Sequence, residues 1–145
     1  MSGMTQDSPA DFDWVGAQAQ CTARSMFERL RTRVREDVDK RNGLFERQDR
    51  WKFEFYDEDE GEFEVLRHVP LRGTETTVKG VVTFVREGSR IQVRGEDVDV
   101  EFVAVVTLDA SGACRFVVGE AVYSDWEIRR MALELLFFEE FGDEE

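Results

Sequence analysis

The densest group of ligand-type side chains in the sequence is the stretch YDEDEGEFE at residues 56–64. Carboxylate oxygens are the ligands that Ca²⁺ prefers, and Asp57 and Asp59 have the spacing of the first two ligands of an EF-hand loop. That loop also needs an acidic or amide ligand at position 5 and a Glu at position 12. Gly61 and His68 occupy those positions here. The calcium template therefore fails, and we predict no metal site in this stretch.

Other groupings that support catalysis are equally weak. His68 is the only histidine, so the chain has no His pair for zinc and no Ser/His/Asp set without it. The glycines form neither GxGxxG nor GxxxxGK[ST], the patterns that cradle phosphates. Among 32 Asp and Glu residues no acid–base pair is singled out. We predict no catalytic residue and no cofactor, and an enzyme with a carboxylate-based site is kept as an alternative.

The two cysteines, Cys21 and Cys114, are separated by most of the chain and belong to no CxxC or Cys/His cluster. Free cysteines are among the most frequently buried residues. We therefore predict two buried, reduced thiols.

Charge restricts the class of partner. The net charge is −13, from 32 acidic and 19 basic residues. Such a chain repels nucleic acid backbones and anionic membrane surfaces, so we expect neither as a partner and favour a protein with a basic surface. The charge is uneven, because residues 24–52 hold ten bases and six acids whereas residues 53–145 hold nine bases and 23 acids. These two parts should attract each other, within one chain or between two copies.

Location is predicted from what the sequence lacks. No apolar run approaches the about 20 residues needed to span a bilayer. The first residues, MSGMTQDSPADFD, have neither the basic nor the apolar region of a secretory signal. We expect a cytoplasmic protein.

The chain is expected to form a frayed lead-in over residues 1–10 and a single α+β domain over residues 11–145. Apolar residues at steps of three and four predict one long amphipathic helix of about 28 residues, capped by Asp11 or Asp13 and stopped at Asn42-Gly43. The residues of that apolar face are Val15, Ala19, Ala23, Met26, Leu30, Val34 and Val38.

After Gly43 the apolar period changes to two, which is typical of strands. Short connections with Gly, Asp and Ser separate six such segments, so we predict a six-stranded antiparallel β-meander. The acidic stretch becomes the hairpin turn between the first two strands. The last predicted strand spans residues 114–123, with Gly119 as a bulge.

A C-terminal helix packed on the sheet is predicted from Ser124, because Ser124-Asp125-Trp126-Glu127 fits the capping box. Residues 131–138, MALELLFF, contain a single charge, so this helix should be covered on more than one side. Either the N-terminal helix packs over it, or a second subunit or a ligand does, and we favour a homodimer formed through the helices. The face expected to form this contact consists of Met131, Leu135, Leu136, Phe137, Phe138 and Phe141.

Two functions are compatible with these patterns. The first is a non-catalytic protein-interaction domain, chaperone-like or immunity-type, that binds a basic partner or a second copy of itself. Its predicted docking residues are Asp57, Glu58, Asp59, Glu60 and Glu62. The second is a helix-grip-like domain that binds a small apolar ligand, unless the aromatic residues simply fill the core. The candidate lining residues are Trp51, Phe53, Phe55, Phe63, Phe84, Phe102, Phe116 and Trp126.

Overall fold

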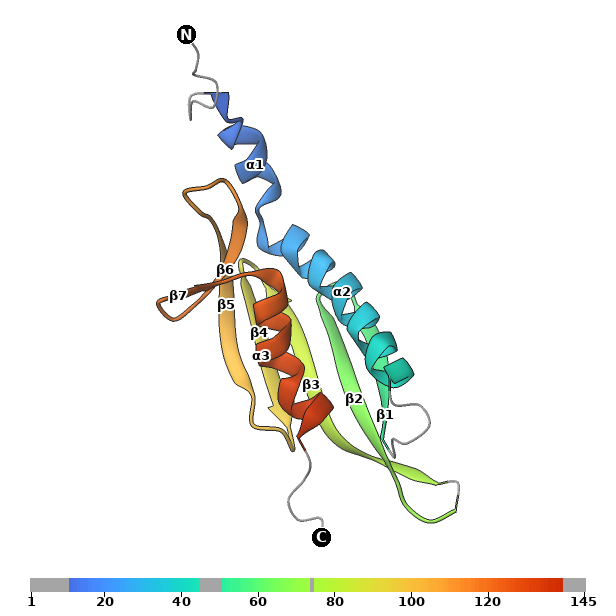
Figure 1. The fold of residues 1–145 in the computed structure, drawn as a ribbon. Coiled ribbons are helices and arrows are strands. Elements are labelled where there is room, and N and C mark those ends of the chain that lie inside the picture. Colours follow the sequence, from blue (N-terminus) through green and yellow to red (C-terminus); the bar gives the residue numbers. More distant parts are fainter. Residues whose placement is uncertain (1–10, 45–50, 74, 140–145) are drawn as a thin grey trace.

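A computed structural model describes residues 11–44, 51–73 and 75–139 of the chain (Figure 1). Two N-terminal helices lead into an antiparallel sheet, and a C-terminal helix packs back on it, which confirms the predicted α+β class. The predicted lead-in over residues 1–10 lies outside the described residues. The elements in chain order are α1 (Trp14–Gln20), α2 (Ala23–Leu44), β1 (Lys52–Asp59), β2 (Glu62–Pro70), β3 (Thr76–Glu87), β4 (Arg90–Glu96), β5 (Glu101–Leu108), β6 (Cys114–Val118), β7 (Ala121–Tyr123) and α3 (Asp125–Phe138).

The sheet is a meander in which each strand pairs with the next in the sequence, in the order β1 to β7. It has seven strands rather than the predicted six. The difference arises at Gly119, whose φ of 62° is left-handed and turns the chain back on itself. The segment predicted as one strand with a bulge is therefore a hairpin, in which Phe116 lies opposite Tyr123.

The predicted long N-terminal helix is present as α2, but it does not extend unbroken to Asp13, because the chain breaks between α1 and α2 at Cys21 and Thr22. The Thr22 hydroxyl accepts a hydrogen bond from the Ser25 backbone N–H at 3.0 Å and caps the start of α2. Asp13 caps α1 in the same way, through the Gly16 N–H at 3.0 Å. The apolar periodicity continues across the break, and so does not reveal it.

The predicted helix stop at Asn42-Gly43 is also wrong, since α2 continues through Leu44. Asn42 instead bonds to the first strand: its side-chain oxygen accepts from the Phe53 N–H at 3.0 Å, and its amide nitrogen donates to the Phe53 carbonyl at 2.9 Å. This reciprocal pair fixes the position of β1 relative to the end of α2.

Helices α2 and α3 cover one face of the sheet, and the core lies between them and the strands (Figure 1). Phe63 is central: its ring stacks on Phe84 with centroids 4.6 Å apart, and lies 5.1 Å from Phe27 of α2. Phe53 and Phe116 are buried in the same cluster. These rings fill the core instead of lining a cavity there, and the small-ligand alternative stays a prediction.

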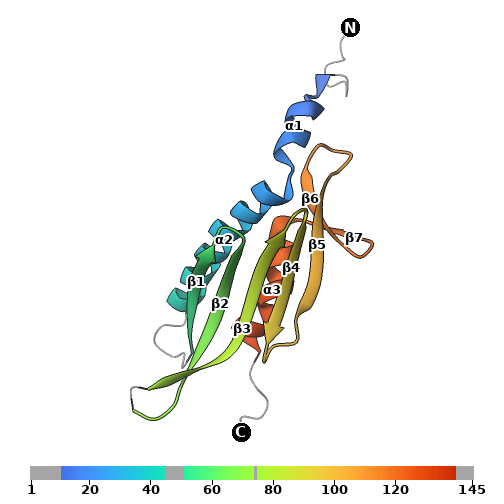
Figure 2. The ribbon, with the colours of Figure 1, turned by 180° about the vertical axis from the view of Figure 1, so that it is seen from behind.

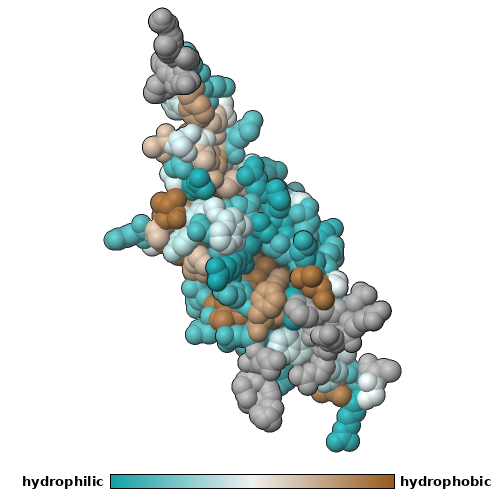
Figure 3. Space-filling model, in the orientation of Figure 1, coloured by the Kyte–Doolittle hydropathy of each residue, from teal (hydrophilic) through white to brown (hydrophobic). Residues whose placement is uncertain are grey.

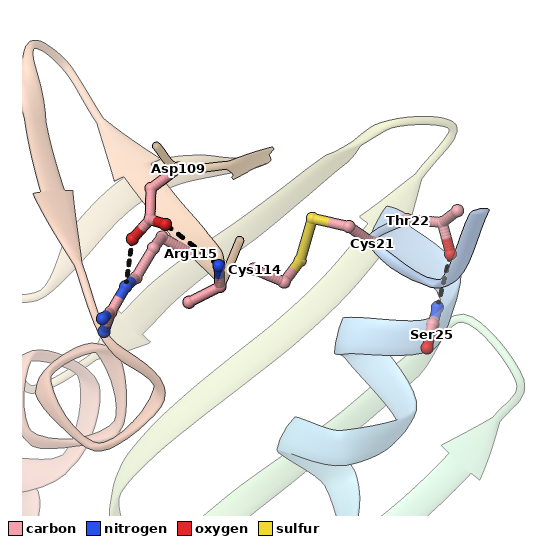
Figure 4. The surroundings of a disulfide bond; sticks show 7 residues. Cys21, Thr22, Ser25, Asp109, Cys114 and Arg115 are labelled. Atoms are coloured by element: carbon pink, nitrogen blue, oxygen red, sulfur yellow. Dashed lines mark hydrogen bonds and ion pairs between the residues drawn. A yellow bond between two sulfur atoms is a disulfide. The ribbon is translucent and has the colours of Figure 1, made fainter. Parts of the chain in front are cut away.

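The two cysteines form a disulfide, with Cα atoms 5.4 Å apart (Figure 4). The prediction of reduced thiols is therefore wrong. Spacing could not reveal the pair, because only the packing of the α1–α2 junction against the start of β6 brings positions 93 residues apart together. Asp109 orders the turn before Cys114 by accepting from the Ala113 N–H at 2.9 Å and from Arg115 Nε at 2.9 Å.

The double substitution Cys21→Ser/Cys114→Ser should lower the free energy of unfolding by roughly 2–5 kcal/mol, because it removes a cross-link over a long loop. Urea denaturation of the oxidised wild-type chain and of the variant measures the difference. Reduced wild-type protein serves as the control and should match the variant. Equal unfolding midpoints for oxidised and reduced wild-type protein would show that the cross-link contributes nothing.

Candidate interaction surfaces

The acidic stretch forms the hairpin between β1 and β2, as predicted. One of its carboxylates, Asp57, is bound within the chain. The guanidinium of Arg31 donates to Asp57 Oδ1, Arg35 Nη2 lies 3.3 Å from Asp57 Oδ2, and Arg31 Nη2 donates to the Glu60 carbonyl at 2.7 Å. The predicted attraction between the basic helix and the acidic remainder thus occurs within a single chain at this point.

These two arginines lie one helical turn apart, so both reach the same strand. The Arg31 guanidinium also lies 5.3 Å from the centroid of the Phe63 ring, and that of Arg35 lies 4.6 Å from Phe55. The Arg31 side chain is 12% exposed and that of Arg35 is 55% exposed. Partial burial strengthens ion pairs and cation–π contacts, so Arg31 is the stronger link between α2 and the hairpin.

None of the helices in the described ranges lies on the opposite face of the sheet, which Figure 2 shows from behind. Strand alternation points Phe63 and Val65 into the core, and so points the residues between and beside them outward. Tyr56, Glu64 and Thr83 are opposite one another in adjacent strands of this outward row. We call the outward carboxylates of β1, β2 and β4 the acidic sheet face; they are Glu54, Glu58, Glu62, Glu64 and Glu96.

The other predicted docking carboxylates lie elsewhere. Asp59 and Glu60 form the turn, where Asp59 Oδ1 accepts from the Gly61 N–H at 2.8 Å. Of the five residues predicted from the sequence, Glu58 and Glu62 belong to the acidic sheet face, while Asp57 points to α2. Glu54, Glu64 and Glu96 were missed, although strand parity identifies the first two as outward residues.

Glu64 is the best-enclosed carboxylate of this face. Partial burial raises its pKa, and the hydrogen bond with the Glu58 side chain and the negative charges of Glu58, Glu62 and Glu96 raise it further. The carboxylates of the acidic sheet face therefore repel one another.

Next to these carboxylates, the outward residues of β5 to β7 include three valines, together with Glu101 and Arg115 at outward positions of the same strands. Val105, Val117 and Val122 are opposite one another across the three strands. Val105 and Val122 are 38% and 56% exposed. The open side of the sheet thus carries the five carboxylates, with Lys52 and Arg94 at outward positions among them, and this valine row beside them.

Replacing Glu64 with Gln should stabilise the protein at neutral pH. The folded-state pKa is raised above its ordinary value of 4.5, so ionisation favours the unfolded chain and stability falls as pH rises through the window above 4.5. Thermal unfolding at pH 7 should give a higher midpoint for Glu64→Gln than for wild type. The difference between the two midpoints should vanish at about pH 3.5. This pH lies below the usual carboxyl pKa, so Glu64 is protonated and neutral, as Gln is. Glu120→Gln, in an exposed turn, is the control and should leave the midpoint unchanged at both pH values.

Two arginines that the sequence reading did not single out lie in the interior. Arg67 is 1% exposed and Arg41 is 6% exposed. Arg67 donates from Nε to the Lys79 carbonyl at 2.8 Å and from Nη1 to the Leu136 carbonyl at 2.8 Å, and its guanidinium lies 4.5 Å from the centroid of the Trp51 ring. The sequence contained a signal for the burial of Arg67, because Arg67 continues the alternation of Phe63 and Val65 and therefore points to the same, inward face of β2.

Arg41 of α2 completes this arrangement by donating from Nε to the Phe137 carbonyl at 2.9 Å. The last carbonyls of α3 lack intrahelical donors, and its last turn contains no basic residue. Arg67 and Arg41 supply that missing positive charge from a strand and from another helix. Burial lowers the pKa of Arg67 to about 10, and the neighbouring charge of Arg41 adds to this effect.

Arg67→Met should lower the free energy of unfolding by about 3 kcal/mol or more, because it removes the donors of the buried Leu136 carbonyl and the part-buried Lys79 carbonyl. Arg67→Lys, which keeps the charge and one donor group, should be affected less. Arg72→Met, at an exposed position, is the matched control and should change stability by no more than about 0.5 kcal/mol. Urea denaturation measures all three, and equal effects at the two positions would contradict a role for Arg67 in holding α3.

The predicted contact face of the C-terminal helix is divided by the structure. Leu136 and Phe137 are buried in the chain's own core, Met131 and Leu135 are half-buried against it, and Phe138 is 57% exposed. Phe141 lies outside the described residues. Most of the apolar surface of α3 is thus covered by the sheet and by α2, and Phe138 is the clearly exposed member.

Phe138 lines a groove between α2 and α3 with a volume of about 390 Å³. Apolar surface is visible on this side of the molecule, with hydrophilic residues next to it (Figure 3). Trp126, placed in a ligand cavity by the sequence reading, lies here and is 56% exposed. The lining residues are Asp37, Lys40, Arg41, Leu44, Trp126, Arg129, Arg130, Leu133, Glu134, Phe137 and Phe138.

His68 is placed at the edge of the open sheet face, where its Nε2 lies 2.8 Å from Glu54 Oε1. Within the described ranges, no three or more His, Cys, Asp and Glu side chains come together as a metal site. No helix in this part of the chain is long and apolar enough to cross a membrane.

Comparison with known proteins gives no relative from which a function could be carried over. No family model matches the sequence, no curated protein matches it, and no solved structure matches the fold. The function is therefore inferred from the surfaces of the chain itself.

Proposed function

We propose that this chain is a non-catalytic protein-interaction domain, chaperone-like or immunity-type, that binds a basic protein partner through the acidic sheet face. The observation that carries the proposal is the one-sided sheet. Both α2 and α3 lie on one face, and the carboxylates of β1, β2 and β4 gather on the other beside the valine row.

The distribution of charge supports a basic partner. Arg31 and Arg35 are engaged with Asp57 on the helix side, whereas the acidic sheet face holds carboxylates that repel one another around Glu64. Lysine or arginine side chains brought to this face relieve that repulsion, and long-range attraction to a chain of net charge −13 speeds their arrival. The partner that fits presents Lys or Arg next to apolar side chains, which contact the valine row.

Two further expectations from the sequence stay predictions. The first is the lack of nucleic acid and membrane partners. The second is residence in the cytoplasm, against which the disulfide weighs, because disulfides persist mainly in oxidising compartments. Alkylation of free thiols in intact cells, followed by mass spectrometry of Cys21 and Cys114, distinguishes the two environments.

The proposed function is tested with a synthetic peptide that alternates Lys and Val, measured by titration calorimetry at low salt. Wild-type protein should bind it, and Glu58→Gln/Glu62→Gln/Glu64→Gln should weaken binding at least about tenfold, since each close charge pair contributes on the order of 1 kcal/mol or more. The control Glu28→Gln/Glu36→Gln/Asp39→Asn removes the same charge from α2 and should retain most of the affinity.

Co-purification with the same three proteins as bait extends the test to natural partners. Basic proteins retained by wild type and by the α2 variant, and lost with the sheet variant, would support the proposal. Equal loss of peptide binding in both variants would contradict it, because binding would then follow net charge alone.

A further inference from the structure

We propose that the chain forms a reciprocal homodimer in which the N-terminal arm of each protomer, residues 11–20, occupies the groove between α2 and α3 of the other. This inference does not depend on the acidic sheet face, which lies on the other side of the sheet. It rests on an arm with little support in its own protomer and on a groove of matching chemistry.

The arm is exposed over most of its length, and its contacts with its own protomer include the Phe12 ring, which lies against Gly112 in the turn before β6. No residue of α1 is buried, and Trp14 and Val15 are both 61% exposed. In Figure 1 the helix extends beyond the end of the sheet, and the disulfide at Cys21 ties its base to β6. A helix of 7 residues is too short to be stable on its own in water. Burial of Trp14 and Val15 against another surface supplies the stability that the arm lacks in its own protomer.

The groove offers an apolar surface for such side chains. Leu133 and Phe137 form its buried part, and Trp126, Phe138 and Leu44 are 56%, 57% and 67% exposed around it. A volume of about 390 Å³ is within the range of pockets that enclose a large apolar group. Exposed aromatic side chains grouped in a concave site are typical of the centre of a protein interface.

Charge selects an acidic occupant. Four basic residues, Lys40, Arg41, Arg129 and Arg130, and two acidic ones, Asp37 and Glu134, line the groove. Arg129 is paired with Asp37 and Asp125, Arg130 is paired with Glu134, and Arg41 is buried against the Phe137 carbonyl. Among the described residues, Lys40 is therefore the lining base that is available to a second chain. The arm carries Asp11 and Asp13 and no basic residue. Attraction between Lys40 and these carboxylates favours the arm of a second copy as the occupant of the groove.

The positions of arm and groove allow a closed dimer. The arm precedes the first residue of α2, and the groove lies along the last two turns of α2, beside Lys40 and Leu44. These sites are at opposite ends of a helix of 22 residues, about 33 Å long. Two copies facing each other with α2 antiparallel therefore place each arm at the other's groove. Such an isologous contact closes at two copies and does not extend into a fibre.

Sedimentation velocity at tens of micromolar protein and low salt tests the proposal. Wild type should be dimeric, and Trp14→Ala should raise the dimer Kd at least about tenfold, as expected for a central aromatic anchor. Since α1 buries none of its residues, this variant should keep the thermal midpoint of the monomer.

Charge exchange gives the sharper test. Lys40→Glu should weaken the dimer, and adding Asp11→Lys to the same chain should restore it, because the opposite charges then face each other again. Lys52→Glu, an equal change on the open side of the sheet, is the matched control and should leave dimerisation unchanged.

Mixing two variants checks reciprocity. Trp14→Ala and Phe138→Ala chains, each weakened alone, should form a mixed dimer with one intact arm–groove contact. A wild-type chain that stays monomeric at 100 μM overturns the proposal. So does a dimer that is unaffected by both Trp14→Ala and Lys40→Glu, since its interface would then lie on another surface.

Discussion

Two buried arginine side chains hold the C-terminal end of α3 against the rest of the protein. Arg67 from β2 and Arg41 from α2 donate to the Leu136 and Phe137 carbonyls, so a strand, one helix and the end of another helix meet at one positively charged point. A helix end packed against a core needs donors for its last carbonyls, and the sequence of α3 provides none. Gly80 of β3 lies against this end of α3 and has a φ of 118°. A Cβ atom at this position would come within 2.8 Å of the Leu136 side chain, so only glycine lets α3 pack this closely on β3. The close packing of α3 on β3 depends on these residues together.

Once α3 is held in place, both helices lie on the same face of the sheet and the other face is left open. This one-sided cover also separates the charges. The arginines of α2 meet the acidic hairpin at Asp57, while Glu64 and its neighbours point away from every helix. Net charge alone says only that the chain attracts basic molecules. The sheet restricts that attraction to one surface of the molecule, because these carboxylates lie on its open face beside exposed valines.

The helix-covered side of the molecule contains a site with more basic than acidic residues. This site is the groove between α2 and α3, and an acidic, apolar arm extends from the far end of α2. The disulfide between Cys21 and Cys114 links the base of that arm to β6, so the direction in which the arm leaves the domain is fixed by a covalent bond. The two surfaces thus lie on opposite sides of the sheet, and we propose the first for a basic partner and the second for a second copy of the chain.

By itself the sequence determined the elements whose signals are local. Alternation of apolar residues identified the strands, short turns made the sheet a meander, and the capping box at Ser124 placed the start of α3, where the Ser124 N–H donates to Glu127 Oε1 at 2.8 Å. Tertiary structure decided what depends on contacts between distant positions. The pairing of Cys21 with Cys114, the binding of Asp57 by α2, and the burial of Arg67 beneath α3 all join residues that no local pattern relates. Periodicity reports which way a side chain points, whereas the partner it meets is fixed only when the sheet and helices pack together.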